Sequence, residues 1–362
     1  MRRKNLIVKR KVNNKNLSIK NPKIRKFYIK FKLKILKVIR KNNFALAVSG
    51  GSDSLCLAYF CKLYSLEYKN KIHVLIVNHR LRKESKKESL KAKKILETLR
   101  IKSKILNWKG KIPTSNIQQG ARNIRYSLLS NYCLNKKIKY LITAHHMDDQ
   151  IENFFIRLLR GSGLKGLSSM SENVNYNNSL KIIRPLLELR KNELKYVTSH
   201  TFKDFISDPS NDNEKFLRVR IRKYKKNMEK EGVDTSNIIK TVNNLNSANK
   251  TLNYYKKKAI YKYASFLSKD KCLINKQIFS EEAGEIIFYS FSDILSLVSG
   301  TYYPPRSKKI INLINRVKVS NFNKSTLGGC VIEKKDDFIL ISKELKTKNH
   351  DTMQQNNHFL KK

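Results

Sequence analysis

The segment from residue 44 to residue 54 reads FALAVSGGSDS and decides the fold of the first half of the chain. Its beginning, Phe44 to Val48, is a short apolar run typical of a buried strand. Two glycines follow, and the next run, Leu55 to Tyr64, has helical character. Glycines let the backbone turn tightly and approach an anion closely, and the first N–H groups of a helix attract phosphate. The segment therefore predicts a strand, a phosphate-binding turn and a helix in succession.

Apolar runs and helical patterns alternate along the chain after this segment. Strands are predicted at residues 44–48, 72–78, 105–108 and 140–144, and helices at 55–64, 86–99, 117–134 and 147–159. Such alternation indicates βαβ units, so we expect an α/β fold in which helices cover both faces of a parallel sheet. Ligands of these sheets bind beyond the carboxyl ends of the strands. Those ends carry the loop 49–54, Asn78-His79 and His145-His146.

Composition suggests four parts. We expect a basic arm with a lead-in helix at 1–40, a catalytic domain at 41–215, a basic helical and mixed α+β region at 216–345, and a polar tail at 346–362. The first 41 residues carry 17 Lys and Arg but no Asp or Glu. We interpret Met1 to Asn21 as a disordered basic arm and Phe27 to Ile39 as a basic amphipathic helix.

The region after residue 215 has a weaker pattern. Helices are expected at Arg218–Lys230 and Asn237–Tyr263, and short strands at Leu273–Ile278, Cys330–Ile332 and Phe338–Ile341. The spacing of Arg218, Arg220 and Arg222 places alternate arginines on different faces of a helix, so we expect at least one of them to serve the structure.

The charge of the chain is strongly positive. It holds 77 Lys and Arg against 28 Asp and Glu, a formal net charge of +49. Such a charge favours an anionic partner, with nucleic acid ahead of anionic lipid. A codon bias toward Lys and Asn is an alternative source of part of the excess. No stretch of about 18 apolar residues predicts a membrane span. The five cysteines, an odd number without a C-x-x-C pair, fit a reducing, cytoplasmic compartment.

A second group of polar residues stands at TAHHMDDQIE, residues 143–152. On a helix Asp149 and Glu152 share a face, as do Asp148 and Glu152. Carboxylates beside a phosphate loop can hold magnesium or a cationic substrate. Ordinary acidic residues at a helix N-terminus are an equally open explanation of the spacing. The adjacent His145 and His146 favour a site, although a structural role for His146 also stays open.

The loop SGGSDS, residues 49–54, resembles the PP-loop of ATP pyrophosphatases and lacks the Lys of the Walker pattern. The wider set of motifs resembles the tRNA(Ile)-lysidine synthetase family of that superfamily. These motifs are ALAVSGGSDSL at 45–55, VNHRLR at 77–82, GARNIRY at 120–126, TAHHMDDQIE at 143–152, RLLRGSGLKGL at 157–167, RPLL at 184–187, DPSN at 208–211 and RVRIR at 218–222. The resemblance is looser beyond residue 225. Arg80 departs from it, because the family usually has Gly there.

The resemblance implies a PP-loop (adenine nucleotide alpha hydrolase-like) domain and a two-step ligation. ATP would activate C2 of the wobble cytidine in the CAU anticodon of tRNA(Ile) as an O-adenylate, releasing pyrophosphate. The amine of L-lysine would then attack C2 and expel AMP. The implied cofactors are ATP, as substrate, and Mg²⁺. The implied partners are tRNA(Ile) and L-lysine, without a membrane, and a homodimer stays open.

The resemblance also implies roles for individual residues. It implies catalysis by Asp53, Arg125 and His145, and ATP binding by Ser49, Gly50, Gly51, Ser52, Asp53 and Ser54. It implies lysine binding by Asp149 and Glu152, Mg²⁺ binding by Asp53 and Asp148, and tRNA or phosphate contacts by Arg82, Arg122, Arg160, Asn211, Arg218, Arg222 and Arg306.

Other functions compete with this interpretation. A tRNA thiolase of the same superfamily is the nearest alternative, but thiolation commonly uses a C-x-x-C pair that this chain lacks. GMP and NAD synthetases give no reason for the basic arm. An RNA-binding protein with a decayed PP-loop leaves Asp53, His145 and the pair Asp148-Asp149 unexplained.

Overall fold

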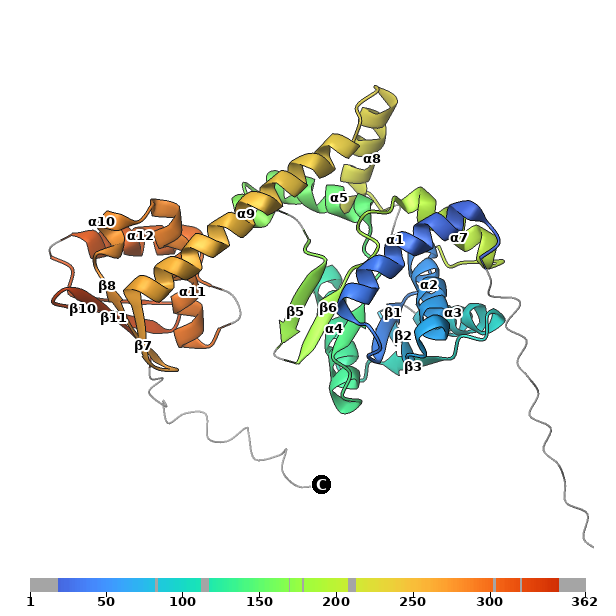
Figure 1. Cartoon of the computed structure of the whole chain (residues 1–362), viewed down its shortest axis with the longest axis horizontal. Coiled ribbons are helices and arrows are strands. Elements are labelled where there is room, and N and C mark those ends of the chain that lie inside the picture. The colour runs from blue at the N-terminus through green and yellow to red at the C-terminus, as the bar shows by residue number, and fades with distance from the viewer. Residues whose placement is uncertain are drawn as a thin grey trace, which may run out of the picture. The chain divides into compact units, whose positions relative to one another are not determined.

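The computed structural model describes residues 19–81, 84–111, 117–168, 170–177, 179–207, 213–301, 304–319 and 321–344. It divides into two compact units, Met1–Leu245 and Asn246–Lys362, and each is described by itself (Figure 1). This division falls 30 residues after the boundary expected at residue 215. The arm expected at the N-terminus, up to residue 18, and the polar tail lie outside the described residues.

The first unit is built on a six-stranded sheet in the order β3-β2-β1-β4-β6-β5. Its strands are β1 (Phe44–Val48), β2 (Ile72–Asn78), β3 (Ser103–Asn107), β4 (Tyr140–Ile142), β5 (Asn173–Asn177) and β6 (Leu180–Ile183). All neighbouring pairs are parallel except β5 and β6. The α/β fold with a parallel sheet is confirmed. Strand order reverses at β1, which lies between β2 and β4, and this places the expected ligand crevice beside the end of β1.

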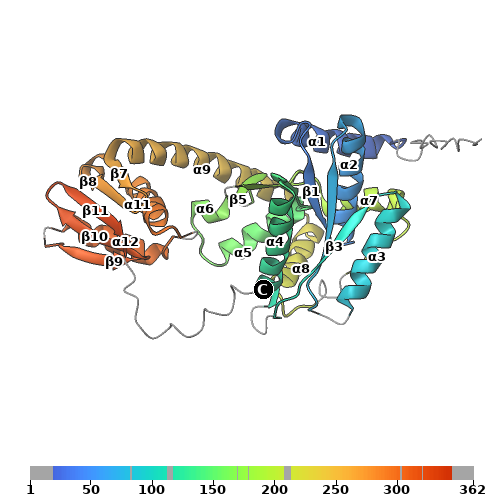
Figure 2. The same ribbon diagram turned by 90° about the horizontal axis from the view of Figure 1, so that it is seen from below.

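Helices cover both faces of this sheet (Figure 2). The helices of this unit up to residue 230 are α1 (Pro22–Val38), α2 (Ser52–Tyr68), α3 (Ser85–Thr98), α4 (Ile117–Asn135), α5 (Met147–Leu158), α6 (Leu164–Leu167), α7 (Lys191–Thr201) and α8 (Leu217–Lys230). Successive side chains of a strand point to opposite faces. In β1, Phe44, Leu46 and Val48 therefore pack with α1, α2, α3 and α7. Ala45 packs with α4 on the other face.

The helix α1 belongs to the core of the first unit. The Asn21 side chain caps its start by accepting hydrogen bonds from the N–H groups of Lys23 and Ile24, and Pro22 suits the first turn. Ile24, Phe27, Phe31 and Ile35 form its buried stripe. The expected amphipathic helix is confirmed, with a start five residues earlier than expected.

The second unit holds an antiparallel sheet in the order β7-β8-β11-β10-β9. Its elements are β7 (Ala264–Ser268), β8 (Lys271–Asn275), α10 (Ile278–Glu281), α11 (Gly284–Ser299), α12 (Ser307–Lys318), β9 (Lys324–Leu327), β10 (Cys330–Lys335) and β11 (Phe338–Lys343). The helix α9 (Ser236–Tyr263) leads into it. Side chains of α11, including Phe291 and Ile294, pack against Ile332 and Ile341 of the sheet. The three expected strands are confirmed as β8, β10 and β11.

No helix within the described ranges is both long enough and apolar enough to cross a bilayer.

Candidate functional site

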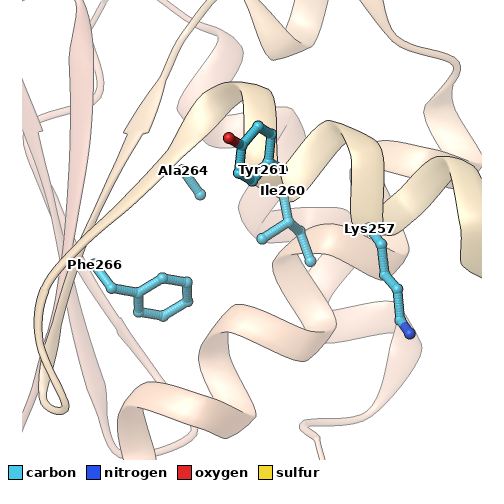
Figure 3. Close-up of a pocket in the computed structure, with 5 residues that line it drawn as sticks. All are labelled: Lys257, Ile260, Tyr261, Ala264 and Phe266. Atoms are coloured by element: carbon cyan, nitrogen blue, oxygen red, sulfur yellow. The ribbon is translucent and has the colours of Figure 1, made fainter.

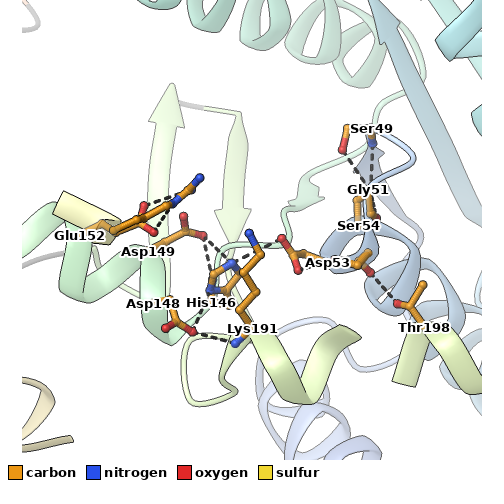
Figure 4. A network of polar contacts seen from close by, with 12 residues as sticks. Ser49, Gly51, Asp53, Ser54, His146, Asp148, Asp149, Glu152, Lys191 and Thr198 are labelled. Carbon is orange, nitrogen blue, oxygen red and sulfur yellow. Dashed lines mark hydrogen bonds and ion pairs between the residues drawn. The ribbon is translucent and has the colours of Figure 1, made fainter. Parts of the chain in front are cut away.

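The glycine-rich turn between β1 and α2 is held together by one hydroxyl. The oxygen of Ser54 accepts hydrogen bonds from the backbone N–H groups of Ser49, at 3.1 Å, and Gly50, at 3.2 Å. The same hydroxyl donates to the carbonyl of Gly51 at 2.9 Å (Figure 4). The turn is therefore closed on itself, with the N-terminus of the 17-residue α2 beside it.

Gly50 is required at its position for two reasons. Its φ is +89°, which L side chains rarely adopt. A Cβ there would lie 2.6 Å from Cδ1 of Ile206 and 2.9 Å from Cβ of Ala92. The carbonyl of Gly50 also accepts a hydrogen bond from the N–H of Ile206 at 2.9 Å. Ile206 and Ala92 thus pack against one side of the turn, and the other side lines the pocket described below.

The carboxyl end of β4 brings two histidines to the same edge of the sheet. Nδ1 of His145 lies 2.9 Å from the hydroxyl of Thr143. Burial lowers the pKa of His145 well below its usual range. Asp149 acts in the opposite direction, and the guanidinium groups of Arg184 and Arg122 lower the pKa further. His145 is therefore neutral at pH 7.

His146 is only 3% exposed and contacts carboxylates. Its Nε2 lies 3.4 Å from Oδ2 of Asp53 and 3.6 Å from Oδ2 of Asp149. Burial alone would lower the pKa of His146, but the contact with Asp53 and the charges of Asp149 and Asp148 outweigh burial and raise it. The sequence left a structural role and a site role open for His146, and here it links the loop after β1 to the start of α5.

The carboxylates of α5 are paired with cations of α8. Glu152 is 2% exposed and receives two hydrogen bonds from Arg222, Nε to Oε1 at 2.6 Å and Nη2 to Oε2 at 3.2 Å (Figure 4). Nε of Arg218 lies 2.9 Å from Oε2 of Glu152. Asp148 pairs with Lys225. Glu152 therefore has the cationic partners that a buried carboxylate needs, since an unpaired buried charge is costly.

Asp148 and Asp149 also cap the polypeptide around them. Asp148 accepts a hydrogen bond from the backbone N–H of Lys191 at 2.7 Å, at the start of α7. Asp149 accepts one from the N–H of His146 at 3.2 Å, at the start of α5. Burial raises the pKa of Asp148, yet the hydrogen bonds from Lys225 and Lys191 outweigh it and the net shift is downward. The expected acidic pattern thus serves both helix ends and ion pairs.

A pocket of about 280 Å³ opens at this edge of the sheet. Nine of the expected site residues line it: Ser49, Gly51, Asp53, Ser54, Arg122, Arg125, His145, Asp149 and Arg218. They come from the segments that follow β1 and β4, from the start of α2, and from α4, α5 and α8. The pocket combines a glycine-rich turn, two carboxylates and three guanidinium groups. This set can bind a polyphosphate at one side and a cationic group at the other.

The other expected residues lie elsewhere. Gly50 and Ser52 form the packed side of the loop, where the carbonyl of Ser52 accepts a 2.7 Å hydrogen bond from Thr198. Asp148, Glu152 and Arg222 belong to the ion pairs beside the pocket. Arg160 is exposed just beyond the end of α5, and Arg306 precedes α12 in the second unit. Arg82 and Asn211 lie outside the described residues.

Among the polar residues that line the pocket are three for which the sequence predicted no role: His79, Tyr126 and Thr143. The signal for His79 was its place at the end of β2, a strand end next to the loop. Arg184 and Lys225 were also missed, although Arg184 is only 6% exposed and donates to the carbonyl of Ser171 at 2.7 Å. The contact of Lys225 with Asp148 joins residues 77 positions apart in the sequence.

The arginine at position 80 has a left-handed backbone, with φ +60°. This conformation explains why glycine would suit the position. Oδ1 of Asn78 accepts a hydrogen bond from the N–H of Arg80 at 3.1 Å, and Nδ2 of Asn78 donates to Asn107 at 3.0 Å. The departure from the family pattern is therefore accommodated by a local hydrogen-bonded turn.

The helix α8 separates its arginines as expected. Arg218 and Arg222 are four residues apart and both reach the α5 carboxylates. Arg220 points elsewhere and donates to the backbone carbonyl of Glu214 at 3.0 Å. The expectation that one of the alternate arginines serves the structure is confirmed.

Comparison with known proteins agrees with this geometry. The family model described as a PP-loop domain matches residues 22–227. The tRNA(Ile)-lysidine synthase of Orientia tsutsugamushi (strain Boryong) is 36% identical over 313 residues, which are 83% of this chain and 69% of that protein. The enzyme of Wolbachia pipientis wMel is 36% identical over 308 residues, 84% of this chain and 71% of that protein. The enzyme of Rickettsia akari (strain Hartford) is 33% identical over 324 residues, 88% and 74%.

Among solved structures, the U34-tRNA thiolase NcsA from Methanococcus maripaludis with its [4Fe-4S] cluster is similar in fold. The TM-score is 0.55 at 21% identity, covering 63% of this chain and 81% of that chain. That likeness concerns the fold alone. The match to the family model and the sequence identities to these relatives both point to the same family. The chain belongs to the tRNA(Ile)-lysidine synthase family of PP-loop proteins.

Proposed function

We propose that this chain is a tRNA(Ile)-lysidine synthase, an ATP-dependent ligase that joins L-lysine to the wobble cytidine of the CAU anticodon. The O2 atom of cytosine attacks the α-phosphorus of ATP, and the bond to the β-phosphate oxygen breaks and releases pyrophosphate. The lysine ε-nitrogen then bonds to C2, the C2–O bond breaks, AMP leaves with the oxygen, and the amine loses a proton. The pocket at the reversal of strand order, with its glycine-rich turn and Asp53, carries this proposal.

The loop 49–54 is proposed to bind the phosphates of ATP. Its backbone precedes a 17-residue helix whose first N–H groups favour negative charge. Arg122 and Arg125 line the same pocket and add positive charge for the α-phosphate and the leaving pyrophosphate. The neutral His145 is proposed to orient the α-phosphate by a hydrogen bond.

The acidic groups fit Mg²⁺ held together with ATP. No set of three His, Cys, Asp or Glu side chains in the described ranges is arranged to hold a metal ion by itself. Mg²⁺ is usually bound by one or two carboxylates plus substrate phosphates. Asp53 lines the pocket, so it fits this arrangement. The ion would neutralise charge on the leaving pyrophosphate. Asp148 stays a second expected ligand, although its pairing with Lys225 and the Lys191 N–H favours a structural role.

The lysine substrate is proposed to place its α-ammonium against Asp149, which lines the pocket. Glu152 would contribute through the arginines that it holds, Arg218 and Arg222, or directly once they move. The ε-amine must be neutral to attack, and desolvation inside the pocket favours the neutral form.

The basic residues outside the pocket are proposed to contact tRNA. Arg160 of the first unit and Arg306 of the second unit are both exposed. Arg82 and Asn211 keep the same role as expectations. A cytoplasmic site of action, where tRNA is available, and a homodimer are further expectations, the latter to be measured by light scattering.

The deciding experiment measures pyrophosphate release from ATP with the purified chain. Sustained release, beyond the first adenylation of each tRNA, is expected only when both L-lysine and tRNA(Ile) with a CAU anticodon are present, and nucleoside mass spectrometry is expected to find lysidine. Activity that needs a sulfur donor instead of lysine would establish a thiolase. Release that ignores tRNA would contradict both tRNA-modifying functions. All five cysteines are buried and free, which supports the ligase over the thiolase.

A further inference from the structure

One face of α9 in the second unit alternates cations and aromatic rings. Lys250, Tyr254, Lys257 and Tyr261 recur at spacings of four, three and four residues, so they share one side of the helix. All four are exposed, Tyr254 by 65% and Tyr261 by 92%. Because these aromatic rings are exposed to solvent, they are not part of the hydrophobic core of the unit.

The opposite side of the same helix is buried. Ala259 and Tyr263 belong to the core of the second unit, and Lys256 pairs with Asp293. The helix is therefore anchored by one side and presents the other as a fixed surface. This arrangement separates the exposed rings from any structural requirement of the second unit.

A hollow of about 390 Å³ continues this exposed face onto β7. Lys257, Ile260 and Tyr261 of α9 line it together with Ala264 and Phe266. Figure 3 shows the Phe266 ring directed from the strand toward the helix, where Ile260 and Tyr261 lie. Phe266 is 45% exposed. The hollow thus offers two aromatic rings and an aliphatic floor, with an ammonium group beside them.

The second unit as a whole is basic. Residues 246–362 contain 21 Lys and Arg against 10 Asp and Glu, a formal net charge of +11. A matching partner needs flat apolar faces and negative charge at close spacing. An unpaired nucleotide has both, because its base stacks on aromatic rings while its phosphates pair with lysine. Aromatic stacking of this kind is tolerant of base identity.

We propose that the surface made by Lys250, Tyr254, Lys257, Tyr261 and Phe266, here called the α9 platform, binds an unpaired nucleotide of RNA. The base enters the hollow and stacks on Tyr261 and Phe266, and Lys250 and Lys257 contact the flanking phosphates. The inference rests on the proposed function only for the identity of that RNA as the tRNA substrate. Stacking on the platform needs neither ATP nor lysine.

The first test locates the contact in the full chain. A short single-stranded oligouridylate containing 4-thiouridine is crosslinked by light, and the crosslinked peptides are identified by mass spectrometry. Crosslinks are expected in the peptide that contains Tyr261 and Phe266. Crosslinks confined to the first unit would overturn the proposal. The matching duplex is expected to give few crosslinks at the platform, since its bases are already stacked.

The second test measures affinity by the fluorescence anisotropy of labelled tRNA. Tyr261→Ala is expected to weaken binding by about 5- to 150-fold, the range of one lost base stack. Tyr261→Phe is expected to retain binding because the ring remains, whereas Tyr261→Leu is expected to behave like alanine. Tyr224→Ala removes a tyrosine of α8 that is 64% exposed and is the matched control without effect. Because Tyr261 is 92% exposed, its variants are expected to fold, which circular dichroism checks.

The salt dependence separates rings from charges. Lys257→Ala is expected to reduce the slope of log affinity against log salt by about 0.7, as for one lost contact to a single-stranded phosphate. Tyr261→Ala is expected to leave the slope unchanged while lowering affinity. Equal slopes for both variants would contradict the division of roles on the platform.

Other occupants give different results. If the platform joins two copies of this chain, light scattering will show a dimer that Tyr261→Ala dissociates, and the proposal is overturned. If Tyr261→Leu binds as well as Tyr261→Phe, the contact is merely apolar, which also overturns it. Binding to vesicles of anionic lipid that Tyr261→Ala removes, with tRNA affinity unchanged, would indicate a membrane surface instead. A platform that binds RNA in a chain without lysine-dependent pyrophosphate release would contradict the proposed function alone.

Discussion

The two units of this protein place their polar and aromatic residues in opposite ways. In the first unit the charged groups of functional interest are buried and paired with one another, as Glu152 is with Arg222 and His146 with Asp53. In the second unit Lys250, Lys257 and Tyr261 face solvent. Buried charges need partners at fixed positions, whereas exposed ones need none. This contrast supports the proposals that chemistry takes place in the first unit and that the second unit contacts RNA.

The largest effect is expected from Asp53→Asn, which tests the chemical role of the first unit. Loss of a carboxylate beside the phosphates should lower turnover by about 10³-fold, since metal-assisted charge stabilisation contributes several kcal/mol. The affinity for tRNA should change little, because Asp53 is not among the residues proposed to contact tRNA. Pyrophosphate release and tRNA anisotropy measure the two quantities.

The control for this substitution is Asp204→Asn, which removes a 54% exposed carboxylate paired with Lys91 in the same unit. It is expected to leave turnover unchanged. A large loss of tRNA affinity in Asp53→Asn would contradict the proposal that Asp53 serves catalysis and not tRNA binding.

The next effect sharpens the contrast between buried and exposed pairs. Glu152→Gln removes the carboxylate that both Arg218 and Arg222 contact and leaves Asp149, 4.0 Å from Arg218, as the nearest remaining negative charge, so the free energy of unfolding should fall by about 3 kcal/mol. Glu333→Gln, in a pair in which Glu333 is 26% and Lys324 63% exposed, is the matched substitution in the second unit and should leave the melting temperature nearly unchanged. Thermal unfolding followed by circular dichroism compares the two. Equal falls in melting temperature for the two variants would contradict the expected difference between the two ion pairs.

Crowding at the phosphate loop gives the third prediction. Gly50→Ala should lower the free energy of unfolding by about 2–4 kcal/mol, through a left-handed backbone and the overlap with Ile206 and Ala92. Gly232 has a similar φ, +86°, and nothing within 4 Å of an added Cβ. Gly232→Ala is thus expected to cost only the backbone strain, about 1–2 kcal/mol. If both variants lose the same stability in urea unfolding, the loop is less tightly packed than its geometry indicates.

The smallest effect tests whether α1 belongs to the first unit. Asn21→Ala removes the cap of α1 and should lower stability by about 1 kcal/mol. The same amide donates to the Tyr196 hydroxyl at 3.0 Å, so Tyr196→Phe separates that contact from the cap. Amide hydrogen exchange is expected to rise at the start of α1 in Asn21→Ala and to stay low in Tyr196→Phe.

Much of the first unit could be predicted because local signals and the fold agree there. Phe44–Val48 and Ile72–Asn78 are strands at the expected bounds, since apolar β-branched runs ended by turns are strong signals. The parallel sheet then brought residues far apart in the sequence to one edge, which is why Asp53, His145 and Asp149 share a pocket.

Other features of the fold could not be predicted from local sequence patterns. The hairpin of β5 and β6 was missed because Asn173–Asn177 alternates asparagine, a residue depleted in strands, with apolar residues. The pairing of Lys225 with Asp148 joins positions 77 residues apart, which no periodicity reveals. The unit boundary falls after α8 rather than at residue 215 because the cations of that helix are paired with α5.

The Ser54 hydroxyl has a consequence for how nucleotide affinity arises. It already holds the backbone of Ser49, Gly50 and Gly51 in place. Ordering one residue of a loose loop costs about 1–2 kcal/mol in conformational entropy. A loop that is ordered before ATP arrives avoids that loss, so a larger share of the attraction to the phosphates remains available to hold the triphosphate or to stabilise its transition state.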